Sequence, residues 1–250
     1  MATLATLEGN VAGVLGLDWD STAPTAGDGP RLLGWANDAV VDMLRRTHCY
    51  IVCGTITLTA NVADYRLPSS IIAIDDVYMT SSGANFRVRR QTTTDLINMR
   101  LYQTTTSPVQ MYALNGVDML MVFPTPIQAD TLTVYYVPKP TALASPTDDP
   151  STSTLGGIPT EYHYGLELYM MWKAGDAFDD ESSQSGESYR LQYEGDPNTA
   201  PGTSRRDGFI GTMKKDVRKK GGKHQAAIIL PPRGRRTYVP NPGFDIGGTY

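Results

Sequence analysis

The spacing of apolar residues predicts two helices near the start of the chain. Apolar side chains recur at every third or fourth position over residues 3–16, and again from Asp28 to Arg46. Such a period places them on one face of an amphipathic helix. Asp28 suits the N-cap of the second helix, and Arg45 with Arg46 suits its negative C-terminal end. Residues 1–54 are therefore expected to contribute the first helices of a helical domain.

The hydrophobic period then changes to two. Ile56 and Leu58 alternate with threonines from Thr55 onward, which predicts a strand. Further strands are expected over 71–79, 85–89, 109–114, 117–123 and 131–137, with a short helix over 93–100. Asn115-Gly116 predicts a two-residue hairpin turn, because a type I′ turn needs positive φ at both central positions. Residues 55–138 are thus expected to form an inserted antiparallel β-domain.

The helical pattern returns after a polar connection. Residues 139–157 are rich in Pro, Ser, Thr and Asp, which is typical of a linker. A strong apolar stripe predicts a central helix over 160–180, and a further helix is expected over 183–194. These helices belong to a segment, 158–220, that completes the helical domain and ends in a last helix or a solvated arm.

The C-terminal segment differs from the rest in composition. After Gly221-Gly222 the chain is rich in Pro and Gly and has no helical period, so residues 221–250 are expected to be an extended tail that orders only on a partner. The predicted fold class is therefore α+β, a small helical bundle with an inserted antiparallel β-domain and an extended C-terminal tail.

Bulk properties favour a chain with a genuine core and no membrane segment. Of its 250 residues, 40% are hydrophobic, but no run approaches the ~20 apolar residues that span a bilayer. The first residues lack the basic and apolar regions of a secretory signal. We therefore expect no membrane partner, and assembly in the cytoplasm.

Charge is distributed unevenly along the chain. Net charge is −4, yet residues 205–236 hold eleven Lys and Arg and only two acids, which leaves −13 for the rest. This asymmetry predicts contact with an acidic surface, either nucleic acid or protein. The residues available for such a contact are Lys214, Lys215, Arg218, Lys219 and Lys220. A solvated charged arm is the alternative interpretation.

The tail also carries an apolar patch, which favours a protein partner. The residues expected to dock are Lys223, Ile228, Ile229, Leu230, Pro231, Pro232, Arg233, Arg235, Arg236, Tyr238 and Phe244. An exposed apolar triplet in such a segment usually indicates that a partner buries it. Aromatic residues are sparse near the lysines, which argues against a stacking platform for single-stranded nucleic acid.

No motif for catalysis or metal binding was found. His48, His163 and His224 lie in no zinc-binding pattern, and Cys49 and Cys53 have no second cluster to complete a metal site. The chain also lacks a nucleophile elbow and a phosphate-binding glycine loop. We therefore expect a protein that is not an enzyme and has no metal or cofactor.

Three acidic clusters are candidate cation or proton sites. Asp75 and Asp76 would point to opposite sides of a strand, and Asp148-Asp149 lie in the linker. Asp179-Asp180-Glu181 follow the central helix. None has the spacing of a calcium loop, so all three clusters are expected to be solvated.

Two segments resemble a known family. In residues 57–77 a strand leads through Tyr65-Arg66-Leu67-Pro68 into a second strand, and Ile158-Pro159-Thr160-Glu161-Tyr162-His163 begins the central helix. Together with the order of the elements, they make residues 25–195 similar to the head-to-tail connector (adaptor) proteins of tailed bacteriophages. The interrupted region at 195–208 and the long tail depart from the family pattern.

This resemblance implies a structural virion protein in the neck between capsid and tail. By this resemblance, copies of the chain would form a homo-oligomeric ring, usually twelvefold. The ring would join the portal protein to a downstream neck or tail protein and let DNA pass through its lumen. The tail would then extend to the portal or to a neighbouring copy. The alternatives are another neck or tail-completion protein and a non-specific DNA-binding protein.

Overall fold

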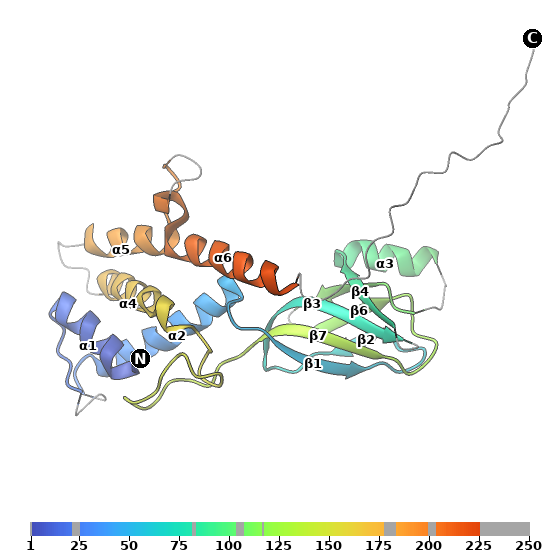
Figure 1. Cartoon of the computed structure of the whole chain (residues 1–250), viewed down its shortest axis with the longest axis horizontal. Coiled ribbons are helices and arrows are strands. Elements are labelled where there is room, and N and C mark those ends of the chain that lie inside the picture. The colour runs from blue at the N-terminus through green and yellow to red at the C-terminus, as the bar shows by residue number, and fades with distance from the viewer. Residues whose placement is uncertain are drawn as a thin grey trace, which may run out of the picture.

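A helical domain and a β-domain lie side by side along the long axis of the molecule. A computed structural model describes residues 2–21, 26–81, 84–103, 108–116, 118–177, 184–199 and 204–225. The β-domain lies between α2 and α4 in the sequence, so the chain leaves the helical domain once and returns (Figure 1). The α+β architecture with an inserted sheet, predicted from the periodicities, is confirmed.

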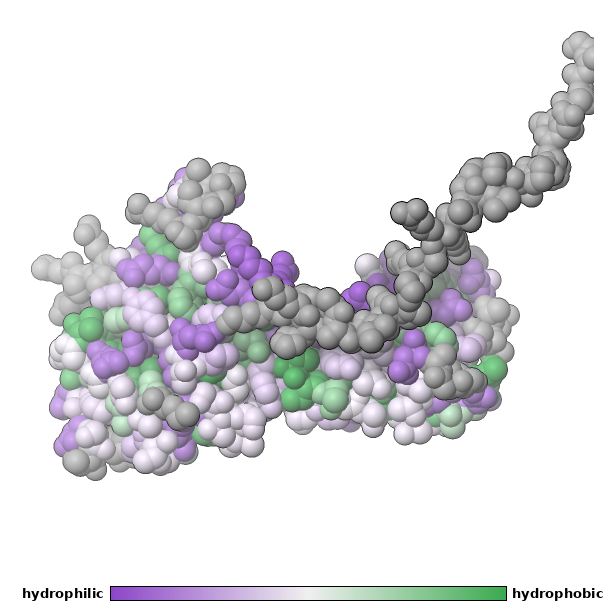
Figure 2. All heavy atoms as spheres, in the orientation of Figure 1, coloured by the Kyte–Doolittle hydropathy of each residue, from purple (hydrophilic) through white to green (hydrophobic). Residues whose placement is uncertain are grey.

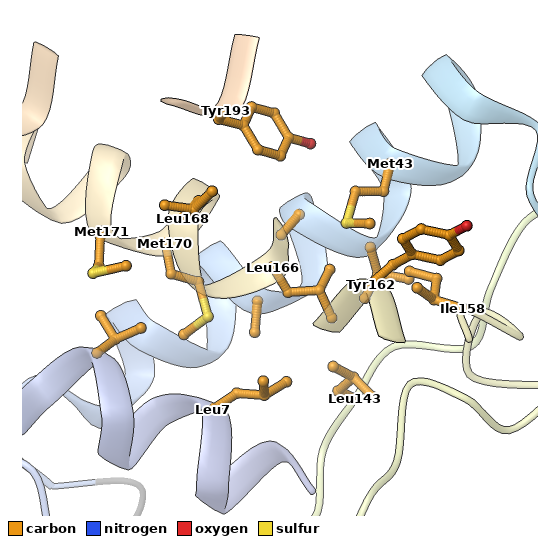
Figure 3. Packing of buried hydrophobic residues seen from close by; sticks show 14 of the residues in the cluster. Leu7, Met43, Leu143, Ile158, Tyr162, Leu166, Leu168, Met170, Met171 and Tyr193 are labelled. Carbon is orange, nitrogen blue, oxygen red and sulfur yellow. The ribbon is translucent and has the colours of Figure 1, made fainter. Parts of the chain in front are cut away.

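The helical domain is built around α4 (His163–Ala177), which a 3₁₀ turn at Thr160–Tyr162 introduces. The helices packed around α4 or alongside it are α1 (Leu4–Leu15), α2 (Gly29–Thr47), α5 (Gln184–Glu194) and α6 (Ser204–Gln225). Figure 3 shows Leu7, Met43, Leu166 and Tyr193 converging from four different helices. The central helix expected over 160–180 is thus confirmed up to Ala177; residues 178–183 lie outside the described residues.

The first two helices each end in a residue with left-handed backbone conformation. Gly16 follows α1 with φ 67°, and its backbone N–H donates to the Ala12 carbonyl. His48 ends α2 in the same left-handed conformation and donates to the Leu44 carbonyl. Asp28 occupies the N-cap of α2 as predicted, but its carboxylate makes no capping hydrogen bond and instead accepts from the backbone N–H of Asp18 at 3.2 Å.

Seven strands form one curved sheet in the order β1-β7-β3-β4-β5-β6-β2. Their bounds are Val52–Thr57 (β1), Asp64–Arg66 (β2), Ile71–Ser81 (β3), Ala84–Arg90 (β4), Met111–Asn115 (β5), Met119–Phe123 (β6) and Thr131–Pro138 (β7). The expectation of a purely antiparallel sheet is corrected at one place, since β4 and β5 pair in parallel. A parallel pair needs a crossover, and α3 (Thr93–Tyr102) lies within that crossover.

The predicted hairpin forms, but its turn differs from the expected type I′. Asn115 pairs with Met119, so three residues connect β5 and β6, and Asn115 belongs to the strand. Gly116 takes the left-handed conformation with φ 68°. Because Asn115 belongs to the strand and Gly116 is the first of three loop residues, the Asn-Gly signal located the hairpin but not its turn type.

The sheet has its own hydrophobic core, separate from that of the helices. Its buried residues include Leu58, Val77, Leu120 and Leu132. On the sheet's other side, α3 places Leu96 against Ala113, Met121 and Phe123. Successive residues of β6 alternate between the two clusters, with Leu120 in one and Met121 in the other, so both faces of this strand are buried.

Helix α6 extends further than the sequence predicts. A helix or arm was expected over 206–220, followed by an extended tail from Gly221. The structure instead continues the helix through Gly221 and Gly222 to Gln225, so the backbone of Lys223 is helical. Residues 226–250 lie outside the described residues.

Candidate docking cleft at the junction of the two domains

Two glycines bring the start of α6 against α4 and the end of α5. Gly208 has φ 60° and ψ −169°, which kinks the start of α6, and a Cβ there would lie 2.3 Å from the Gly195 nitrogen. Phe209 packs on Gly165 of α4, where a Cβ would lie 2.1 Å from its ring. Because larger side chains would collide at both positions, glycine is required for α6 to run from this point toward the sheet (Figure 1).

A cleft of about 720 Å³ lies where α6 approaches the end of α2 and strand β3. Its residues are Arg45, Arg46, Thr47, His48, Ile51, Asp75, Ile210, Lys214, Val217 and Arg218. Ile51, Ile210 and Val217 supply an apolar lining, and Ile51 is more than one third exposed at 38%. Figure 2 shows hydrophilic side chains along the visible surface of α6 beside this junction. The cleft therefore combines apolar contact area with basic groups.

One of the cleft cations is already neutralised by carboxylates. Arg46 donates through Nη2 to Glu194 Oε1 at 2.8 Å, and its Nε lies 3.6 Å from Asp42 Oδ1. Burial lowers the pKa of the Arg46 guanidinium, but Asp42 and Glu194 outweigh this effect and hold that pKa above its ordinary value. The Tyr193 hydroxyl also donates to Asp42 Oδ2 at 2.8 Å, so this network joins α2 to α5.

The remaining cations of the cleft have no such partner. Arg45, Lys214 and Arg218 are exposed, and no carboxylate among the described residues lies within ion-pair distance of them. Lys214 and Arg218 are four residues apart on α6 and so share one face of the helix. The three cations attract a negatively charged group that none of the described carboxylates supplies.

A histidine–aspartate contact crosses the junction. His48 Nδ1 lies 3.1 Å from Asp75 Oδ1, which connects the end of α2 to β3. Asp76 instead accepts from Arg87 at 2.6 Å. The expectation that Asp75 and Asp76 point to opposite sides of a strand therefore agrees with their separate partners. Of the described residues that line the cleft, Asp75 is the one with a carboxylate.

Of the basic residues singled out in the sequence, Lys214 and Arg218 line the cleft. Lys215 pairs with Asp207, and Lys219 is exposed but does not line the cleft. The side chains of Lys220 and Lys223 are not among those described, although the backbone of both is helical. The predicted docking residues from Ile228 to Phe244 lie outside the described residues.

Sequence reasoning missed the other wall of this cleft. Arg45 was assigned only to the helix dipole, and Ile51 and Ile210 carried no signal of their own. The residues up to Asp75 and those from Ile210 onward are separated by more than 130 residues of chain, so no local motif connects the two walls. The Arg45-Arg46 pair at a helix end was the one visible indication.

Neither a metal centre nor a membrane helix is present in the described ranges. No group of three or more His, Cys, Asp or Glu side chains gathers closely enough there to hold a metal ion. Within those same ranges, no helix has both the length and the apolar character needed to cross a bilayer.

Comparison with known proteins assigns the chain to a family. The model of the SU10 adaptor protein family matches residues 2–209. The chain belongs to this family. The resemblance to phage adaptors is therefore confirmed, over a longer stretch than the 25–195 expected. No curated protein matches this adaptor.

The family match bears directly on the cleft. It covers the β-domain and the helical domain as far as Phe209, just past the kink in α6. The wall formed by Arg45, His48 and Asp75 lies inside the match, whereas Lys214 and Arg218 of this adaptor lie beyond it. Membership of a phage adaptor family implies a structural, non-enzymatic role and contacts with other phage proteins.

Proposed function

We propose that this adaptor forms a closed ring of identical copies in the phage neck, between capsid and tail. The ring joins the portal to the downstream neck or tail protein, and DNA passes through its lumen. The family match over residues 2–209 carries the proposal. Twelvefold symmetry is the expected stoichiometry, as the resemblance implies.

The shape and surface of the chain are consistent with this role. One end of each copy is built from helices and the other from the sheet, so the two ends offer different surfaces. A ring closes when one surface of each copy binds a different surface of the next. The part of the predicted tail that follows α6, residues 226–250, would extend to the portal or to a neighbouring copy and bury Ile228, Ile229 and Leu230 there.

Tight binding of DNA in the lumen would oppose this function, because the genome must slide through. We therefore assign most of the basic tail to a protein contact. The unpaired cations Arg45, Lys214 and Arg218 favour one second candidate, non-specific binding of DNA, which weakens steeply as salt rises.

The decisive experiment mixes the purified chain with the portal of the same phage and images the product by negative-stain electron microscopy. A ring seated on the portal is expected. A chain that neither binds the portal nor is found in purified virions would refute the proposal. A gel-shift series with duplex DNA from 50 to 300 mM salt tests the second candidate, and no shift at the lowest salt removes it.

A further inference from the structure

The unpaired basic cleft needs an acidic occupant, and the chain contains one. Arg45, Lys214 and Arg218 line the cleft together with Ile51, Ile210 and Val217, so a complementary ligand carries several negative charges beside an apolar group. Phe178-Asp179-Asp180-Glu181 has this composition, and Asp179 to Glu181 is the longest acidic run in the sequence. We propose that this segment of one copy binds the basic cleft of a second copy.

The position of the segment follows from how α4 and α5 pack. A Cβ on Gly186, near the start of α5, would lie 3.0 Å from the Gly175 carbonyl carbon, near the end of α4. At the other end of α5, the Tyr193 ring lies 5.4 Å from that of Tyr169. The two helices are therefore antiparallel neighbours, and the chain connects them at the end that carries Ala177 and Gln184.

The cleft lies at the opposite end of α5. Glu194, the last residue of that helix, pairs with Arg46 at 2.8 Å, and Arg46 lines the cleft. Ten residues of helix separate Glu194 from Gln184, which amounts to about 15 Å. Ala177 and Gln184, the described residues on either side of the segment, therefore lie at the end of α5 that is far from the cleft.

Chain length prevents the segment from entering its own cleft. Asp180 is three residues from Ala177, and Glu181 is three residues from Gln184. Three residues span at most about 11 Å when fully extended, and the direction back along α5 is occupied by the packed helices themselves. The occupant must therefore come from another copy.

Such a contact has the geometry that a ring requires. The cleft and the helix ends that flank the acidic segment lie at opposite ends of α5, so each copy would offer one of each to its neighbours. Charge complementarity also fixes the register between copies and excludes like-charged pairings. The inference rests on the proposed ring, to which it adds the two surfaces that meet.

The test reverses charge on each surface of the full chain. One variant carries Lys214→Glu with Arg218→Glu, and the other carries Asp179→Lys, Asp180→Lys and Glu181→Lys. A matched control carries Lys139→Glu with Lys219→Glu, two exposed cations that do not line the cleft. Circular dichroism and thermal unfolding verify that each variant folds.

Assembly is measured by mass photometry, alone and on the portal, over a salt series. Each surface variant is expected to need at least a tenfold higher concentration to assemble than the wild type, whereas the control assembles normally. Equimolar mixing of the two surface variants, or combining both sets of changes in one chain, is expected to restore assembly. Wild-type assembly is expected to weaken as salt rises, because salt screens exposed charges.

Other outcomes overturn the contact and separate it from the proposed function. Surface variants that assemble on the portal with wild-type copy number refute the contact and leave the ring intact. A wild type that does not bind the portal refutes the proposed function, whereas assembly lost in each variant and restored by mixing still supports the contact. If Lys214→Glu with Arg218→Glu abolishes binding of a 60-base-pair duplex and leaves assembly unchanged, the cleft binds nucleic acid instead.

Discussion

The hydroxyl of Tyr193 offers a precise test of how the helical domain is held together beside the cleft. The ring is fully buried against Tyr169 and Trp172, and the hydroxyl donates to Asp42 Oδ2 at 2.8 Å. Tyr193→Phe keeps the ring and removes only that hydrogen bond. The substitution therefore isolates one link between α5 and α2.

The expected cost follows from the acceptor and its surroundings. A hydrogen bond to a charged group contributes about 1.5–3 kcal/mol. Asp42 keeps its contact with Arg46 at 3.6 Å, and its side chain is 29% exposed, so water replaces part of the lost bond. We expect Tyr193→Phe to lower the free energy of unfolding by about 1–2 kcal/mol. The melting temperature should fall by about 3–6 °C.

The measurement is urea and thermal unfolding at one fixed protein concentration, because self-association raises apparent stability. Tyr164→Phe is the matched control: its ring is 53% exposed, and the change should leave the stability within about 0.5 kcal/mol of the wild type. Tyr193→Ala also removes the ring and should cost about 3–5 kcal/mol. A Tyr193→Phe variant as stable as Tyr164→Phe, or as unstable as Tyr193→Ala, would refute the reasoning.

Three further tests concern the core, a buried carboxyl and the kink. Leu7→Ala, at a fully buried position, should cost about 2–5 kcal/mol in urea unfolding. Burial raises the pKa of the Glu8 carboxyl from 4.5 to about 6 and outweighs the hydrogen bond from the Trp19 indole, which lowers it. The folded state therefore holds the proton more tightly than the unfolded state, and the free energy of unfolding should fall as pH rises from about 4.5 to 6. Glu8→Gln should remove this fall, which urea midpoints at pH 4.5, 5.5 and 7 would reveal. Gly208→Ala should lower the free energy of unfolding by more than about 2 kcal/mol, because Gly208 has a positive φ and close neighbours. Gly13→Ala in α1, where a Cβ meets nothing, should raise it by up to about 1 kcal/mol. Melting temperatures measure both changes.

The sequence predicted an element best where its apolar stripe ran over many residues. The stripe that begins at Tyr162 belongs to a helix in contact with several neighbours, so tertiary packing reinforced the local pattern. The pairing of β4 with β5 was mispredicted, because alternation specifies that a segment is a strand but not which strand it joins. The same limit applied to the Asn115-Gly116 turn, whose loop length depends on the register of both strands.

At the end of α6 the sequence predicted too short a helix. Gly221 and Gly222 weaken a helix by about 1 kcal/mol each relative to alanine, so the sequence favoured a break there. The helix nevertheless continues to Gln225. Propensity is a weak prior that a preceding helix can overcome, and the difference moves Lys223 from the tail into the helix.

The sequence alone determined the class of the protein, because periodicity, charge and two short segments are local properties of the chain. Side-chain direction repeats every 3.6 or 2 residues, so helices and strands can be identified without knowing their partners. The adaptor resemblance likewise depended on contiguous residues. Only the tertiary structure brought Arg45, Ile51 and Asp75 together with Lys214 and Arg218 to form a cleft. That proximity depends on how α6 packs against the end of α2 and β3, and no local pattern specifies such packing.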